Sequence, residues 1–211
     1  MLNNSAQIVK RETKALLFDQ YGTIVDMQSG LVEMVTPFLK KKGWAGNPSQ
    51  FVTWWRRKHF EDSMIDSLID QGHTPYRQIG HRAVSQVMGR AEIVYSQDEV
   101  EWLISCIEKL KPFPDVVESL EALKNLYRLC ILSNGDRDML ETAKKYIGFN
   151  FDLTISVQEA GALSPTGEPM PKLKVLFIKN LEKSKEVESF LLPIMHSIVS
   201  VQRLTDLGLF S

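Results

Sequence analysis

The fold of this chain is decided by a short stretch near its N-terminus, ALLFDQYGTIVD, residues 15–26. A run of four apolar residues leads into the carboxylate of Asp19, and Gly22 follows as a turn residue. Such a run, bounded by a turn, is typical of a strand buried in a parallel sheet. Open α/β sheets place their chemistry just beyond the carboxyl ends of such strands. We therefore expect a strand over residues 14–19 and a functional carboxylate at Asp19, with turn capping as the alternative role.

The next 85 residues have the pattern of a helical block. Apolar residues recur at helical spacing, and the first helix is expected to end before Gly43. A second helix is expected to start at residues 47–49, and a third at Pro75 with Thr74 as its N-cap. Ser96 is expected to open a fourth helix over residues 97–110. Helices between two sheet elements predict an inserted cap, residues 27–111.

The sheet is expected to resume after the prolines of residues 112–114, which block a continuing helix. Asp115 and Glu118 have the spacing of a capping box at the start of a helix. Strands are expected over residues 129–133 and 151–157, separated by a helix that Gly148 closes. This alternation predicts the α/β class: a Rossmann-like parallel sheet core, residues 1–26 and 112–163, with the helical cap inserted after its first strand.

Three short motifs carry a resemblance to a known family. The string DQYGTIVD of residues 19–26, the WRRK of residues 55–58 and the SNG of residues 133–135 resemble the haloacid dehalogenase (HAD) superfamily of hydrolases, and most closely its L-2-haloacid dehalogenase branch. Phosphatases of the superfamily carry a second Asp two residues after the nucleophile, where this chain has Tyr21. The resemblance therefore implies a hydrolase without a metal or other cofactor.

The resemblance also assigns roles to residues. Asp19 is the implied nucleophile, Thr23 hydrogen-bonds its surroundings, and Arg56 holds the departing halide and the substrate carboxylate. A guanidinium suits that role because it stays charged and offers a fork of donors. The SNG motif at a strand end offers a hydroxyl and backbone N–H groups, and these neutral donors suit a substrate carboxylate or a developing oxyanion. The expected catalytic residues are Asp19, Thr23, Arg56, Ser133 and Asn134, and the expected substrate-binding residues are Gln20, Tyr21, Arg56, Phe60, Ser133 and Asn134.

The composition, with 44% hydrophobic and 24% charged residues, is ordinary for a soluble globular protein. The formal net charge of −1 gives no indication of nucleic acid or membrane partners. No apolar run approaches the roughly 20 residues that span a bilayer. Cys106 and Cys130 lie far apart in apolar segments, which favours buried free thiols in a reducing compartment. We expect a cytoplasmic protein that acts on a small 2-haloacid or related carboxylate, and a homodimer is left open.

The resemblance breaks after about residue 163. Ser164 stands where the family has a catalytic Lys, and Asp206 does not fit the family's later water-activating Asp because no strand precedes it. Read one base earlier, codons from Leu163 permit Lys-Pro-His-Arg-Arg-Thr-Tyr-Ala-Lys, and codons from Pro193 permit Ala-Asn-His-Ala-Phe-Asp-Cys-Ile-Gly-Ala-Lys. Both peptides look like the missing motifs, in one frame and in order. We interpret residues 164–211 as a divergent tail produced by a frameshift or gene-model error.

Three hypotheses about function remain after this reading. The first is a dehalogenase with Asp19 as nucleophile and turnover impaired by the altered tail. The second is a superfamily phosphatase with an unusual motif, against which Tyr21 speaks. The third is a non-catalytic binding or accessory protein whose affinity for carboxylates depends on Arg56 and not on Asp19.

Overall fold

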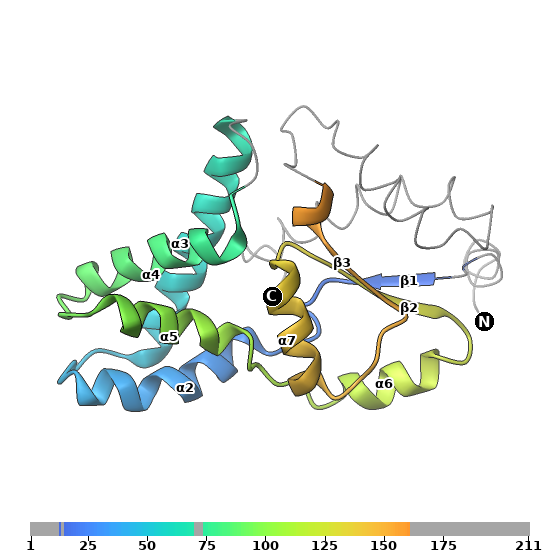
Figure 1. Ribbon diagram of the computed structural model, residues 1–211. Helices are drawn as coiled ribbons and strands as arrows, with labels where there is room; N and C mark the ends of the chain where they lie inside the picture. Colours follow the sequence, from blue (N-terminus) through green and yellow to red (C-terminus); the bar gives the residue numbers. More distant parts are fainter. Residues whose placement is uncertain (1–12, 14, 70–73, 161–211) are drawn as a thin grey trace, which may run out of the picture.

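The computed structural model describes residues 13, 15–69 and 74–160, and every structural statement below concerns these residues (Figure 1). Sheet and helices alternate along this part of the chain. In order, the elements are β1 (Ala15–Phe18), α2 (Met27–Lys41), α3 (Pro48–Ile69), α4 (Tyr76–Arg90), α5 (Gln97–Ile107), α6 (Val116–Leu123), β2 (Arg128–Ser133), α7 (Arg137–Ile147), β3 (Leu153–Ser156) and the short 3-10 helix η1 (Val157–Ala160).

The three strands form one parallel sheet in the order β1-β2-β3. Phe18 pairs with Ile131, and Ser133 pairs with Ser156, so the strands end at a common edge. In Figure 1, α6 and α7 lie below the strands, and β1 runs toward the helices α2–α5. The predicted α/β class with a parallel sheet is confirmed, although β1 and β3 are shorter than the expected strands.

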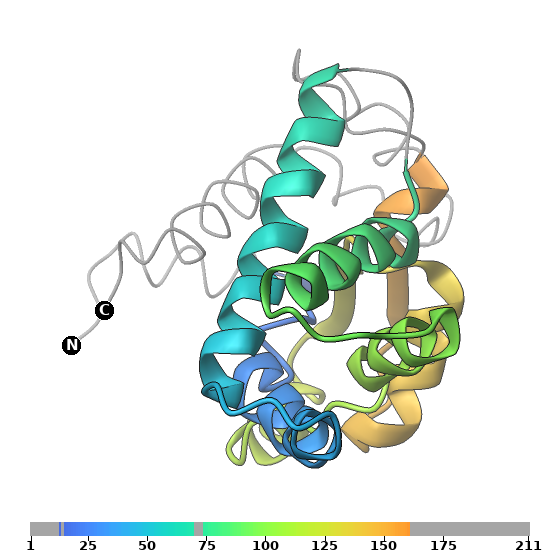
Figure 2. The ribbon, with the colours of Figure 1, turned by 90° about the vertical axis from the view of Figure 1, so that its left-hand side faces the viewer.

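Helices α2–α5 pack into a four-helix block beside the carboxyl-terminal edge of the sheet (Figures 1 and 2). Each helix contributes buried apolar side chains to its interior, and fully burying one such side chain stabilises the fold by roughly 1.5–3 kcal/mol. Leu31 of α2, Trp55 of α3, Val84 of α4 and Leu103 of α5 are all inaccessible to solvent. The aromatic Trp55 is therefore part of the core of this block.

The chain enters and leaves the four-helix block through two segments that lie side by side. The amide of Asp26 donates to the carbonyl of Lys111 at 3.2 Å, and the amide of Phe113 donates to the carbonyl of Ile24 at 3.1 Å. Asp26 also caps α2, because its Oδ1 accepts from the amide of Ser29 at 2.9 Å. The two connections thus form one paired junction between the sheet and the helices.

Helix starts were predicted with mixed success. Ser96 opens α5 in a complete capping box with Glu99, as its position predicts. Thr74 is wrong as the N-cap of α4, because its amide and hydroxyl donate to Asp66 instead. Asp115 precedes α6 but its side chain makes no capping hydrogen bond, so the expected capping box is wrong as well. Gly148 closes α7 in the left-handed region at φ 74°, as expected.

The two cysteines are free and buried, as expected. Burial raises the pKa of both the Cys106 and Cys130 thiols to about 11. In the described part of the chain, no helix combines the length and apolarity that a membrane crossing requires. The tail of residues 164–211, with Ser164 and Asp206, lies outside the described residues.

Candidate active site

The loop after β1 places Asp19 at the edge of the sheet. Asp19 is half-buried and directly follows the last paired residue of β1. Beyond it the backbone folds back tightly, since the carbonyl of Gln20 accepts from the amides of both Ile24 and Val25, at 3.1 and 3.0 Å. Gly22 adopts φ 94°, a conformation that L side chains rarely take. This turn fixes the direction in which the chain leaves Asp19.

The loop after β2 meets the first loop through Tyr21 and Gly135. A Cβ added at Gly135 would lie 2.8 Å from Cε2 of Tyr21, so the ring rests directly on this glycine. Ser133 is buried, and its Oγ accepts from the amide of Gly135 at 3.3 Å. Ser156 of β3 donates its hydroxyl to the carbonyl of Gly135 at 2.6 Å. The two sequence motifs at residues 19–26 and 133–135 are therefore in contact at the strand ends.

Arg56 on α3 lies against the loop that follows Asp19. A Cβ added at Gly22 would lie 3.7 Å from Nη2 of Arg56, and Nη1 donates to Oε1 of Gln28 at 3.0 Å. Gln28 in turn donates to Ser49 on α3, which ties α2 to the helix that carries the guanidinium. The half-buried Arg56 thus brings a positive charge from the four-helix block to the loop after Asp19.

The remaining expected site residues differ in their exposure. Gln20 is buried, and its Nε2 has no hydrogen-bond partner among the described residues. Phe60 is half-buried on α3, one turn after Arg56, and so on the same side of that helix. Thr23 and Asn134 are exposed. The structure therefore gathers Tyr21, Gly135 and Arg56 around the first loop, while Thr23 and Asn134 stay on the surface.

Two buried titratable side chains lie beside this site. Burial, followed by the nearby Tyr76, Glu108, Asp136 and Asp19, raises the pKa of Tyr21 well above its ordinary value, so the phenol stays protonated. Its hydroxyl has no partner among the described residues. Burial lowers the pKa of His59 to about 4, so this imidazole is neutral at pH 7. His59 is 3% exposed, so it packs inside the protein.

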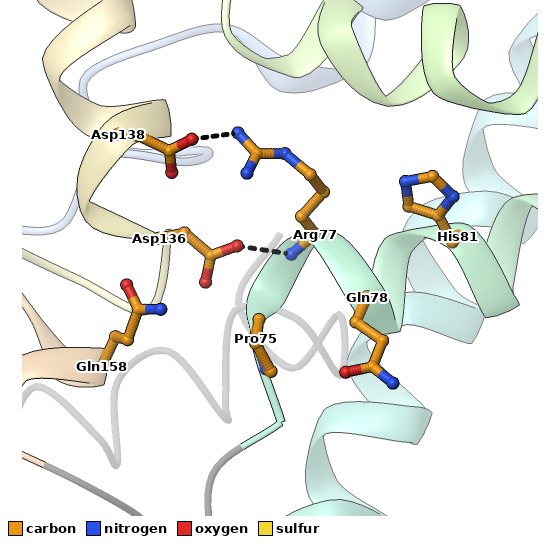
Figure 3. A pocket seen from close by; sticks show the side chains of 7 residues that line it. All are labelled: Pro75, Arg77, Gln78, His81, Asp136, Asp138 and Gln158. Carbon is orange, nitrogen blue, oxygen red and sulfur yellow. Dashed lines mark hydrogen bonds and ion pairs between the residues drawn. The ribbon is translucent and has the colours of Figure 1, made fainter. Parts of the chain in front are cut away.

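A pocket of about 520 Å³ opens where the four-helix block meets the loop after β2 (Figure 3). None of the expected site residues lines it. The guanidinium of Arg77 contacts Asp138 at 2.8 Å and Glu108, which lies outside the lining, at 3.0 Å. Asp136 accepts hydrogen bonds from the backbone amides of Tyr76 and Arg77. The lining residues are Pro75, Arg77, Gln78, His81, Asp136, Asp138 and Gln158.

Asp136 and Tyr76 are the residues at this junction that the sequence did not bring forward. Asp136 directly precedes α7, where a carboxylate predicts the cap of that helix. Its side chain instead binds the start of α4, 60 residues away in the sequence. Its position right after the SNG motif of residues 133–135 was the available signal. In the described part of the chain, no three His, Cys, Asp or Glu side chains gather to hold a metal ion.

Comparison with known proteins places the chain in a family. The model of the haloacid dehalogenase-like hydrolases matches residues 13–187, which is most of the chain and extends past residue 163. The chain belongs to this family of hydrolases. The expected superfamily is therefore confirmed.

Individual relatives are haloacid dehalogenases of bacteria. The (S)-2-haloacid dehalogenase of Xanthobacter autotrophicus is 29% identical over 154 residues, which cover 72% of this chain and 58% of the relative. Haloacetate dehalogenase H-2 of Moraxella sp. (strain B) is 27% identical over 158 residues, which cover 74% of this chain and 67% of the relative. The structure of the Xanthobacter L-2-haloacid dehalogenase with covalently bound chloropropionic acid has a TM-score of 0.68 at 24% identity, covering 82% of this chain and 66% of that one. The chain thus spans about three fifths to two thirds of these proteins.

Proposed function

We propose that this chain carries the nucleophile and the halide-binding side of a hydrolase that converts small 2-haloacids to 2-hydroxy acids. The observation that carries the proposal is the approach of Arg56 to the loop after Asp19. It joins a carboxylate at a strand end to a cation from the four-helix block. In this proposal, residues 27–111 act as a cap over a core formed by residues 1–26 and 112–163.

The proposed reaction has two steps. An oxygen of the Asp19 carboxylate attacks the carbon that bears the halogen, and the halide departs with the bonding electron pair. Water then attacks the carbonyl carbon of the resulting ester, which releases the 2-hydroxy acid, one proton and the restored Asp19 carboxylate. Arg56 stabilises the negative charge that moves from the carboxylate to the halide. The Xanthobacter relative with covalently bound chloropropionic acid supports a covalent route.

The other expected residues surround the substrate in this proposal. Ser133 and Asn134 donate to the substrate carboxylate at the end of β2, and Gln20 supplies a buried amide whose Nε2 has no partner among the described residues. Tyr21 contacts the substrate beside Asp19, and as a protonated phenol it is a donor rather than a base. Phe60 adds an apolar side from α3, and Thr23 supports the turn after Asp19.

A direct experiment tests the nucleophile separately from the binding role. Full-length protein is incubated with 2-chloropropionate, and its intact mass and the released chloride are measured. We expect slow formation of an Asp19 ester and weak turnover, since a neutral Ser164 replaces the family's lysine. Asp19→Asn should abolish the ester and leave binding intact, whereas Arg56→Ala should lose binding. An adduct that persists in Asp19→Asn overturns the proposed nucleophile, and carboxylate binding without any adduct favours the accessory protein.

The altered tail is tested on the gene rather than on the protein. We propose that the shifted frame after codon 162 remains open and encodes the missing lysine and aspartate motifs. The transcript across codons 155–211 is sequenced and read in all three frames. Stop codons in the shifted frame, together with a protein mass that matches all 211 residues, would end this interpretation.

A further inference from the structure

Helix α4 begins without a cap of its own. Pro75 occupies its N-cap position and makes no side-chain capping bond, and Thr74 is bonded to Asp66. The amides of Tyr76 and Arg77 instead donate to the two carboxylate oxygens of Asp136, at 2.8 and 2.9 Å. Figure 3 shows the bond from the Arg77 amide. A negative charge at a helix N-terminus is stabilising, and more so when it is shielded from solvent.

Asp136 is well placed to act as a link. It is 3% exposed and belongs to the loop after β2, whereas α4 belongs to the four-helix block. It stands at the N-cap position of α7 but makes no capping bond there. If Asp136 capped α7, another residue near the start of that helix could take over the cap. Its carboxylate bonds a different helix instead, so it ties the strand ends to the block.

The residue that Asp136 holds is the centre of an aromatic stack. The Tyr76 ring lies parallel to the Tyr21 ring, with centroids 5.4 Å apart and planes at 15°. The Tyr76 ring also contacts the ring of His59, with centroids 4.0 Å apart. Tyr21 is two residues after Asp19, and His59 is three residues after Arg56 on α3. The stack therefore connects the nucleophile loop with the helix that carries the guanidinium.

We propose that Asp136 is a positioning residue of the active site: by fixing the start of α4 it holds the Tyr21–Tyr76–His59 stack, and thereby keeps Arg56 facing the loop after Asp19. This inference rests on the proposed function. The nearby ion pairs of Arg77 with Asp138 and Glu108 are partly exposed and contribute little to the link. Asp138→Ala is therefore a matched control. It removes a neighbouring carboxylate and leaves both hydrogen bonds from the α4 amides to Asp136 in place.

The test measures the arrangement of the two parts without requiring turnover. Spin labels are attached to cysteines introduced at the exposed Val94 and Leu126, one on the four-helix block and one beside the sheet. Cys106 and Cys130 are buried and escape labelling. The distance distribution between the labels is recorded by double electron–electron resonance in the full chain. We expect a narrow distribution in the parent and in Asp138→Ala, a broadened one in Asp136→Ala, and a return toward the parent in Asp136→Asn, whose amide oxygen still accepts.

A double variant separates positioning from simple helix stability. Pro75→Asp in the Asp136→Ala background gives α4 a local cap, because Pro75 occupies the N-cap position with a non-helical backbone, φ −53° and ψ 139°. If Asp136 positions the site, the double variant regains stability but keeps the broad distribution. It also loses affinity for 2-chloropropionate as strongly as Arg56→Ala does, measured by calorimetry. A narrow distribution in the double variant, or in Asp136→Ala itself, overturns the proposal.

These readouts also distinguish the two proposals. If the parent protein does not bind 2-chloropropionate, the proposed function fails, while the distance distributions still decide the role of Asp136. Should Asp136→Ala not fold, the double variant carries the same comparison with Asp138→Ala.

Discussion

Replacing Gly135 by alanine should destabilise the protein and disturb the site at once. The new Cβ would lie 2.8 Å from Cε2 of Tyr21 and 2.9 Å from Cδ2 of Leu140, whereas carbon atoms pack at about 3.5–4.0 Å. Neither neighbour yields easily, because Tyr21 is stacked on Tyr76 and Leu140 is fully buried. Overpacking of this kind costs about 1–3 kcal/mol of unfolding free energy.

The chain offers a matched control for this substitution. Gly89 near the end of α4 has nothing within 4 Å of a Cβ added to it. Alanine there should therefore stabilise the protein, by up to about 0.5–1 kcal/mol, because it favours the helical backbone. Urea unfolding of the parent, Gly135→Ala and Gly89→Ala measures the loss of unfolding free energy in one variant and the gain in the other in a single assay. The reasoning is refuted if Gly135→Ala unfolds at the same urea concentration as the parent, or at a higher one.

Three further outcomes follow from local features. Ser96→Ala should cost about 1 kcal/mol in urea unfolding, because it removes one half of the capping box with Glu99; an unchanged midpoint would mean that the box adds nothing. Since the folded pKa of His59 is about 4 and the unfolded one about 6.5, stability should fall as pH drops from 6.5 to 4, by about 3 kcal/mol, and His59→Leu should flatten this part of the profile. Cys106 and Cys130 should resist a thiol reagent at pH 8 until the protein unfolds, and rapid labelling of the native protein would contradict their burial.

The fold was largely predictable because its signals are local. The apolar run before Asp19 and the run over residues 129–133 indicated strands, and these pair in parallel as β1 and β2. The helical spacing between residues 27 and 111 indicated the block of α2–α5. Each of these signals depends only on the spacing of apolar residues within one element.

The junction between sheet and helices was not predictable in the same way. Thr74 before Pro75 has the pattern of an N-cap, yet its hydroxyl donates to Asp66. The first amides of α4 donate to Asp136 instead. A capping carboxylate supplied from 60 residues away leaves no mark in the local sequence. The aromatic contact of Tyr76 with Tyr21 is hidden for the same reason, since the two tyrosines lie far apart in the sequence. Long-range partners of this kind are decided by the tertiary arrangement rather than by propensity.

The paired crossing of the chain at residues 24–26 and 111–113 has a consequence for how such proteins diversify. Because the two ends of the inserted segment are hydrogen-bonded neighbours, the sheet would need only a tight turn to close without it, at little cost in loop entropy. The two ends of the four-helix block thus lie next to each other. Exchanging the block for another insert would place a side chain other than Arg56 against the loop after Asp19, while the register of β1 against β2 stayed the same.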